Sequence, residues 1–187
     1  MARTTEKEAK TQDKTTKALE RVVNQAVNND GAVEAYLCTL LLPRQFSSNQ
    51  HKANDIFKRI QSDFCKHVLR KTGSTPRYVA VHKQQDDRPA YAFCLFTRPE
   101  AILAKPEDFA QKGSEIANGK SMQSGWANGK MDVMEVFKDA PRFSIASQPV
   151  KITSENQNLV IGQLQEHLQN KSDSTQHQRT LFVSKCQ

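Results

Sequence analysis

The chain has 187 residues, with 27 Lys and Arg against 20 Asp and Glu, which gives a formal net charge of +7. This length fits one domain with a core of its own. No apolar run approaches the ~18 residues that a membrane span needs, and the opening MARTTEKEAK lacks the apolar segment of a secretory signal. The four cysteines form no Cys-x-x-Cys pair, which argues against a zinc site or a disulfide framework. We therefore expect a cytoplasmic protein with no membrane partner, no bound metal and no cofactor.

The first half of the chain opens with a polar segment. Residues 1–16 contain almost nothing apolar, so we expect a disordered tail there, followed by a single α+β domain over residues 17–187. Residues 17–28 place apolar side chains at helical spacing and end at Asn28-Asn29-Asp30-Gly31. Residues 32–42 form an apolar run of strand length that Pro43 stops.

Residues 47–71 carry the clearest helical pattern. Their apolar side chains recur at steps of three and four residues and make one stripe, formed by Ala53, Ile56, Phe57, Ile60, Phe64 and Val68. Ser47 or Ser48 can cap the start of this helix, and Gly73 with Pro76 closes it.

A β-hairpin follows, with strands at residues 77–82 and 90–97 around a turn at residues 85–89, where Asp and Pro favour turn geometry. The remaining pattern predicts helices at 106–118, 121–137 and 154–171 and short strands at 143–146 and 180–183. This order of elements indicates the α+β class, with helices packed on an antiparallel sheet.

The positive charge is concentrated in residues 51–83, which hold eight Lys or Arg and only two Asp. A clustered basic face is typical of proteins that bind a polyanion, most often nucleic acid. A solvated helix face is the ordinary alternative. We predict phosphate contacts for the basic residues in and beside this stretch, namely Arg44, Lys52, Lys58, Arg59, Lys66, Arg70, Lys71, Arg77 and Lys83.

The hairpin and the end of the chain carry a family resemblance. The segments concerned are Arg77-Tyr78-Val79-Ala80-Val81, Pro89-Ala90-Tyr91-Ala92-Phe93-Cys94-Leu95-Phe96, Ser124-Gly125-Trp126-Ala127, Leu164–Lys171 and Arg179-Thr180-Leu181-Phe182-Val183-Ser184. In this order they resemble the replication initiators of filamentous bacteriophages and related prophage proteins, which are rolling-circle endonucleases of the HUH class. The resemblance implies an HUH-endonuclease-like fold and DNA as the partner.

The chain departs from that family at every position that carries chemistry. The His-hydrophobic-His triplet that binds the metal ion in the family is Ala90-Tyr91-Ala92 here. The Glu that commonly completes the site matches Lys83, or His82 if the register shifts by one residue. No tyrosine follows residue 91, and the position of the catalytic tyrosine corresponds to His167. We therefore expect no catalytic residues and an inactive nuclease. The two alanines also suggest a shallow face that a DNA backbone or a partner can approach.

Three functions follow from these observations. The first is a DNA-binding protein of a mobile element that acts as an origin competitor, a repressor or a replication accessory, on single-stranded, hairpin or duplex DNA. The alternative is a protein-interaction module whose partner is a host or phage replication protein. A minor alternative is a metal-dependent nicking endonuclease that uses His82 with His167 or His177.

Overall fold

The structure is a computed structural model that describes residues 2–99, 101, 105–127, 132–169 and 181–184. The helices are α1 (Ala2–Asp30), the short 3-10 helix η1 (Arg44–Phe46), α2 (Gln50–Thr72), α3 (Pro106–Gln123), α4 (Val133–Asp139) and α5 (Gln157–Gln169). The strands are β1 (Ala32–Leu41), β2 (Arg77–Gln85), β3 (Arg88–Thr97), β4 (Arg142–Ile145), β5 (Val150–Thr153) and β6 (Leu181–Val183). The α+β class and the antiparallel sheet predicted from the sequence are confirmed.

The strands form one six-stranded sheet in the order β4-β1-β3-β2-β6. Strand β5 also pairs with β1, so β4 and β5 share the outer edge of β1 along different halves of its length. The hairpin β2–β3 is in register from Arg77 opposite Phe96 to Gln85 opposite Arg88. At the other edge, β6 pairs with β2, and the Ser184 hydroxyl oxygen accepts a hydrogen bond from the Tyr78 backbone N–H at 3.1 Å.

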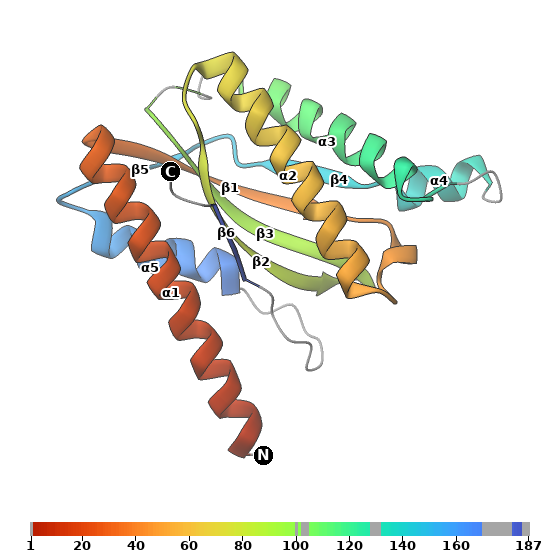
Figure 1. The fold of residues 1–187 in the computed structure, drawn as a ribbon, viewed down its shortest axis with the longest axis horizontal. Helices are drawn as coiled ribbons and strands as arrows, with labels where there is room; N and C mark the ends of the chain where they lie inside the picture. The colour runs from red at the N-terminus through yellow and green to blue at the C-terminus, as the bar shows by residue number, and fades with distance from the viewer. Residues whose placement is uncertain (1, 100, 102–104, 128–131, 170–180, 185–187) are drawn as a thin grey trace.

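Helices cover both faces of the sheet (Figure 1), with α2 and α3 on one side and α1 and α5 on the other. On the α2 side the core is rich in rings, and Phe57 of α2 stacks on Tyr91 of β3 with their centroids 4.2 Å apart. Helix α3 approaches β4 closely at Gly113, where a Cβ atom would overlap the ring of Phe143. On the α1 side, aliphatic residues of α1 and α5 pack on Val79, Val81 and Ala92.

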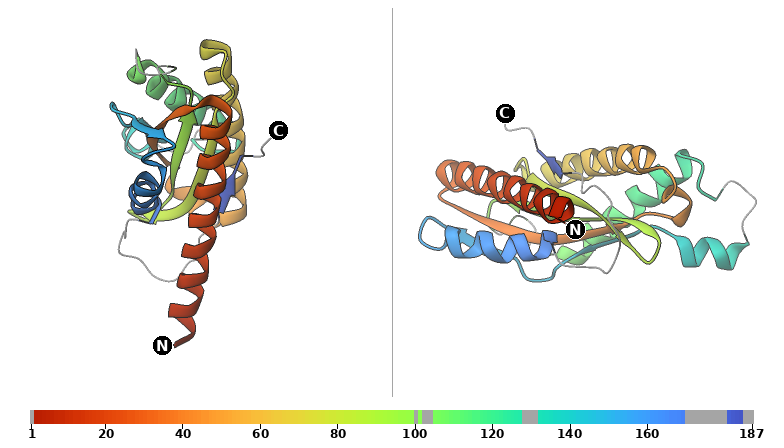
Figure 2. Two further views of the ribbon diagram at one scale, coloured as in Figure 1. Left: turned by 90° about the vertical axis from the view of Figure 1, so that its left-hand side faces the viewer. Right: turned by 90° about the horizontal axis from the view of Figure 1, so that it is seen from below.

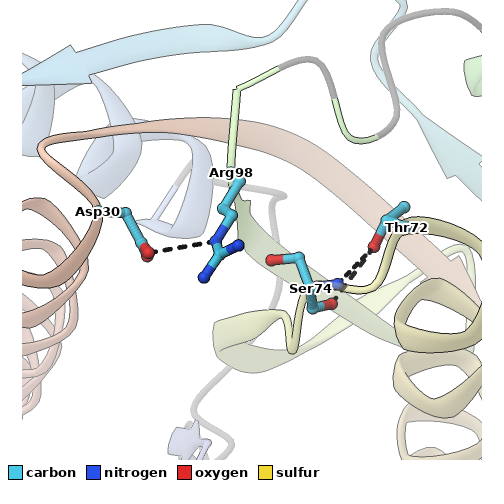
Figure 3. A network of polar contacts seen from close by, with 4 residues as sticks. All are labelled: Asp30, Thr72, Ser74 and Arg98. Atoms are coloured by element: carbon cyan, nitrogen blue, oxygen red, sulfur yellow. Dashed lines mark hydrogen bonds and ion pairs between the residues drawn. The ribbon is translucent and has the colours of Figure 1, made fainter.

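Polar contacts fix the end of the molecule where α1 and α2 both finish (Figure 3). Arg98, just after β3, places its Nε atom 3.2 Å from the Asp30 carboxylate at the end of α1. The Thr72 hydroxyl donates to the Val68 carbonyl at 2.8 Å and accepts from the Ser74 N–H at 3.1 Å. Gly73 adopts a φ of +69°, a left-handed conformation that ends α2 and costs a glycine little.

Several boundaries differ from the sequence prediction. Helix α1 extends back to Ala2 through the segment that we expected to be a disordered tail, and its N-terminal half projects beyond the sheet (Figure 2). This segment contains neither Gly nor Pro, and extending a helix that packing has already nucleated is easier than starting one. Asn49, rather than Ser47 or Ser48, caps α2 by accepting from the Lys52 N–H at 3.0 Å.

The region between residues 106 and 153 differs more. Helix α3 continues to Gln123, and the predicted helix at 121–137 is interrupted near Gly125, whose φ is +93°. Among the described residues after that interruption, the helical conformation returns in the short α4. Strand β5 had no counterpart in the prediction, because its four residues show too short a pattern to separate from a loop.

Candidate nucleic-acid interface

Helix α2 buries an apolar stripe and exposes its basic side chains. Its apolar stripe is buried against the sheet. All six of its Lys and Arg side chains are exposed, namely Lys52, Lys58, Arg59, Lys66, Arg70 and Lys71. We call this set the α2 basic face. It contains six of the nine residues for which the sequence predicted phosphate contacts.

Two aspartates partly neutralise this face. Asp55 lies 3.6 Å from the Lys58 ammonium, and Asp63 lies 3.4 Å from the Lys66 ammonium. The other oxygen of Asp63 lies 2.7 Å from the Lys120 ammonium of α3, and this contact lowers the pKa of Asp63. Surface pairs of this kind contribute little to stability, so they restrain Lys58 and Lys66 only weakly. Six cations against two carboxylates leave the helix with a clear positive excess.

Helix α3 contributes to the same surface, which the sequence reasoning missed. Lys120 joins the face through Asp63, and Gln123 accepts a 2.9 Å hydrogen bond from the Arg59 guanidinium. Both residues lie in the last turn of α3, far from α2 in the sequence. A single sequence carries no signal for such a neighbourhood, because it depends on how the two helices pack.

Arg44 lies in η1, just before α2 in the sequence, and it is exposed. The segment is anchored by Asp139, whose carboxylate accepts from the Arg44 backbone N–H at 3.0 Å and faces the Trp126 indole N–H at 3.3 Å. The buried Arg88 guanidinium reinforces this anchor by donating to the carbonyls of Leu42, Asp139 and Ala140. Arg44 therefore extends from a well-fixed segment, although its own charge is solvated.

Arg77 and Lys83 are not part of the α2 basic face. Their neighbours on β2 alternate between the two cores, with Ala80 on the α2 side and Val79 and Val81 on the α1 side. The two-residue period of a strand places Arg77 and Lys83 with the latter pair. The Lys83 ammonium donates to the carbonyl of His167 in α5 at 2.9 Å. The structure thus separates these two cations from the other seven.

The positions that the family resemblance assigns to chemistry gather on this second side. Lys83 is opposite Ala90 in the hairpin, and His167 lies on the helix that packs over it. The His167 Nε2 atom is 3.2 Å from the Cys38 carbonyl, and burial lowers the pKa of the imidazole. Ala90 and Ala92 are each only 2% exposed. The expected shallow face is therefore closed, because the chain covers it with its own helix α5.

His82 faces the opposite way. Its ring centroid is 5.1 Å from that of Tyr91 on the α2 side, and its Nδ1 atom is 3.4 Å from the Gln50 amide nitrogen. It lines a cavity of about 230 Å³ beside the start of α2. The sheet lies between His82 and His167, so these two imidazoles cannot share a metal ion. His177 lies outside the described residues.

In the described part of the chain, no group of three His, Cys, Asp or Glu side chains is arranged to hold a metal ion. None of its helices combines the length and apolar character that crossing a membrane requires.

Comparisons with known proteins find no matching family model, no matching curated protein and no matching solved structure.

Proposed function

We propose that the protein binds DNA through the α2 basic face and acts on the replication or transcription of a mobile element without cutting the DNA. The observation that carries this proposal is the set of six exposed cations on one helix that carries only two acidic residues. From Lys52 to Arg70 these cations extend over about 27 Å of the helix at 1.5 Å per residue. That length matches about eight nucleotides along one strand of a duplex.

The absence of cleavage follows from the residues at the matched positions. Alanines replace both metal-binding imidazoles, and the Lys83 ammonium would repel a cation from the same place. No phenol is present after residue 91 to attack a phosphodiester. The cleavage route of that family needs a metal ion that polarises the phosphate and a tyrosine that attacks it, and the matched positions supply neither. A domain that resembles a rolling-circle initiator but only binds would compete with the active enzyme, repress, or assist replication.

Salt dependence of DNA affinity tests the proposal directly. If six cations contact phosphates, the logarithm of the association constant should fall with the logarithm of salt concentration with a slope of about −5. The double variant Lys58→Glu, Arg59→Glu should abolish binding, because it reverses two adjacent charges that do not contribute to the apolar stripe. Fluorescence anisotropy with single-stranded, hairpin and duplex probes measures both quantities.

The matched control is Lys138→Glu with Lys151→Glu, which changes the net charge equally at exposed positions outside α2. This variant should retain most of the affinity. A slope near zero, or equal losses in the two variants, would contradict the proposal. The proposal that the protein does not cut DNA is checked by incubating it with DNA and Mg²⁺ or Mn²⁺ and sequencing the DNA ends. New ends would show that a nuclease activity exists.

One observation favours the alternative, a protein-interaction module. Helix α4 buries none of its side chains, and Val133, Met134 and Phe137 are 79%, 60% and 79% exposed. Exposed apolar groups of this size are typical of protein contacts. A partner replication protein whose binding survives nuclease treatment and is lost in Phe137→Asp would support this function.

A further inference from the structure

Helix α4 lies at one end of the molecule (Figure 1) and presents apolar side chains to solvent. Val133, Met134 and Phe137 are 79%, 60% and 79% exposed. Their spacing places all three on one side of the helix, and we call this surface the α4 apolar face. The same periodicity places Glu135 and Asp139 on the opposite side, so these two carboxylates point away from the α4 apolar face.

The helix is anchored at its C-terminal end, although it buries none of its own side chains. The Asp139 carboxylate accepts hydrogen bonds from the Arg44 backbone N–H at 3.0 Å and from the indole N–H of the buried Trp126 at 3.3 Å. The Arg88 guanidinium donates to the Asp139 carbonyl at 3.2 Å. A ring that is exposed on an anchored helix loses little further freedom when it binds a ligand, so Phe137 is suited to a binding role.

Two exposed arginines lie beside the anchored end of α4. Arg142 begins β4 shortly after α4, and it is paired in register with Leu41, which lies shortly before Arg44 in the chain. Burial lowers the pKa of the Arg88 guanidinium, and the charges of Arg142 and Arg44 lower it further, which agrees with their closeness. Exposed apolar and cationic side chains are therefore neighbours at this end of the molecule.

These neighbours favour single-stranded DNA over a protein as the occupant of the α4 apolar face. A protein interface usually takes about 20–30 residues from each partner, and three apolar side chains beside arginines are few for its core. One exposed ring suffices to stack on one base, and the phosphates on either side of that base suit cations. The Lys52 ammonium, at the start of the α2 basic face, lies 5.4 Å from the centre of the Phe46 ring in η1. Because Arg44 belongs to η1 as well, a strand on the α2 basic face can continue past it to α4.

We propose that Phe137 stacks on an unpaired base of single-stranded DNA, and that Arg44 and Arg142 contact the neighbouring phosphates. The bases of a duplex stack on one another, so an unpaired strand is the form that offers its base faces to an exposed ring. Met134 and Val133 extend the apolar surface beside that base. The inference rests on the proposed function, because the α2 basic face holds the rest of the strand, and it names single-stranded DNA as the preferred form.

Fluorescence anisotropy of the full-length chain with a labelled strand of about twenty nucleotides, and with the duplex of the same sequence, tests the inference. We expect Phe137→Ala to weaken binding of the strand about tenfold, as for the loss of one stack, and to leave the duplex affinity and the salt slope unchanged. Leu159→Ala is the matched control, because Leu159 is 73% exposed on α5, on the other side of the sheet. This control should change neither affinity. Phe137→Trp should retain the affinity, and the strand should quench the fluorescence of the added indole.

These substitutions should not disturb the fold, because Phe137 is 79% exposed, and equal urea midpoints would verify this. The inference is overturned if Phe137→Ala binds the strand as well as the unchanged chain does, or loses equal affinity for strand and duplex. Unquenched fluorescence in Phe137→Trp would also overturn it. In each of these cases the proposed function stands, and the α4 apolar face is left to a protein partner. If the unchanged chain binds neither DNA at low salt, the proposed function fails and the inference fails with it.

Discussion

The two sides of the sheet are built from different residues. The core on the α2 side contains ten aromatic residues, whereas Phe96 is the one aromatic residue of the core on the α1 side within the described chain. The second core consists otherwise of Val, Leu, Ile, Ala and Cys. Rings interlock in few orientations and bury a large area each, so the side that carries the basic face is held in a defined position. The positions matched to catalysis in the resemblance lie on the other side, which small residues and α5 close.

The largest expected effect concerns Phe57, a fully buried ring at the centre of the α2 side. It stacks on Tyr91 and also meets Phe182, with centroids 5.0 Å apart. Phe57→Ala should lower the free energy of unfolding by about 4 kcal/mol, because it leaves a large cavity. Val23→Ala, equally buried on the α1 side, should cost about 2 kcal/mol. Urea unfolding of both variants measures the difference, and equal losses would contradict a ring-dominated core.

Gly113 gives a second, smaller effect on the same side. A methyl group at this position would overlap the Phe143 ring, so Gly113→Ala should destabilise the chain by about 2 kcal/mol. Gly119 lies in the same helix with nothing within 4 Å of an added Cβ. Gly119→Ala should therefore stabilise by about 0.5–1 kcal/mol through helix propensity. Thermal unfolding of the two variants measures both effects. If both substitutions stabilise the protein, α3 does not approach β4 closely at Gly113.

The smallest effects concern two histidines, one on each side. Burial lowers the pKa of both His67 and His167, and for His67 the cations Lys112, Lys71 and Arg70 lower it further. An unfolded histidine takes up a proton near pH 6.5, but these folded ones resist it, so the folded state loses stability as the pH falls below that value. His167→Asn should reduce this loss between pH 7 and 5.5, as chemical unfolding at several pH values would show.

Binding of DNA should change the pKa of His67 and leave that of His167 unchanged. Phosphates bound at the α2 basic face would offset the cations around His67 and raise its pKa, while His167 on the far side would titrate as before. NMR titration of the histidine rings with and without DNA measures both values. A change at His167 alone would place the DNA on the α1 side instead.

The sequence predicted the parts of the fold that have a strong local pattern. The stripe from Ala53 to Val68 predicts α2, and the strand-like segments on both sides of the turn at residues 85–89 predict the hairpin. Both aspartates have positive φ values, 50° and 57°, which the Asp side chain tolerates better than most. Patterns of only four residues, such as β5, carry too little information.

The site was predictable only where its members share one element. The six cations of α2 follow from helical periodicity, but the faces of Arg77 and Lys83 depend on strand register. Shifting the register by one residue would exchange Lys83 and His82 between the two sides of the sheet. The cavity that His82 lines combines η1, the start of α2 and the hairpin, and no short stretch of sequence contains all three.

The pairing of β6 with β2 has a consequence for synthesis. Tyr78 and Ser184 are 106 residues apart, so the edge of β2 stays open while the ribosome makes everything between them. Phe182 is also missing from the ring core during that time, which leaves Phe57 without one of its neighbours. Domains fold as units while the chain emerges. The helix that carries the basic face therefore gains its full support only when residues 181–184 have left the ribosome.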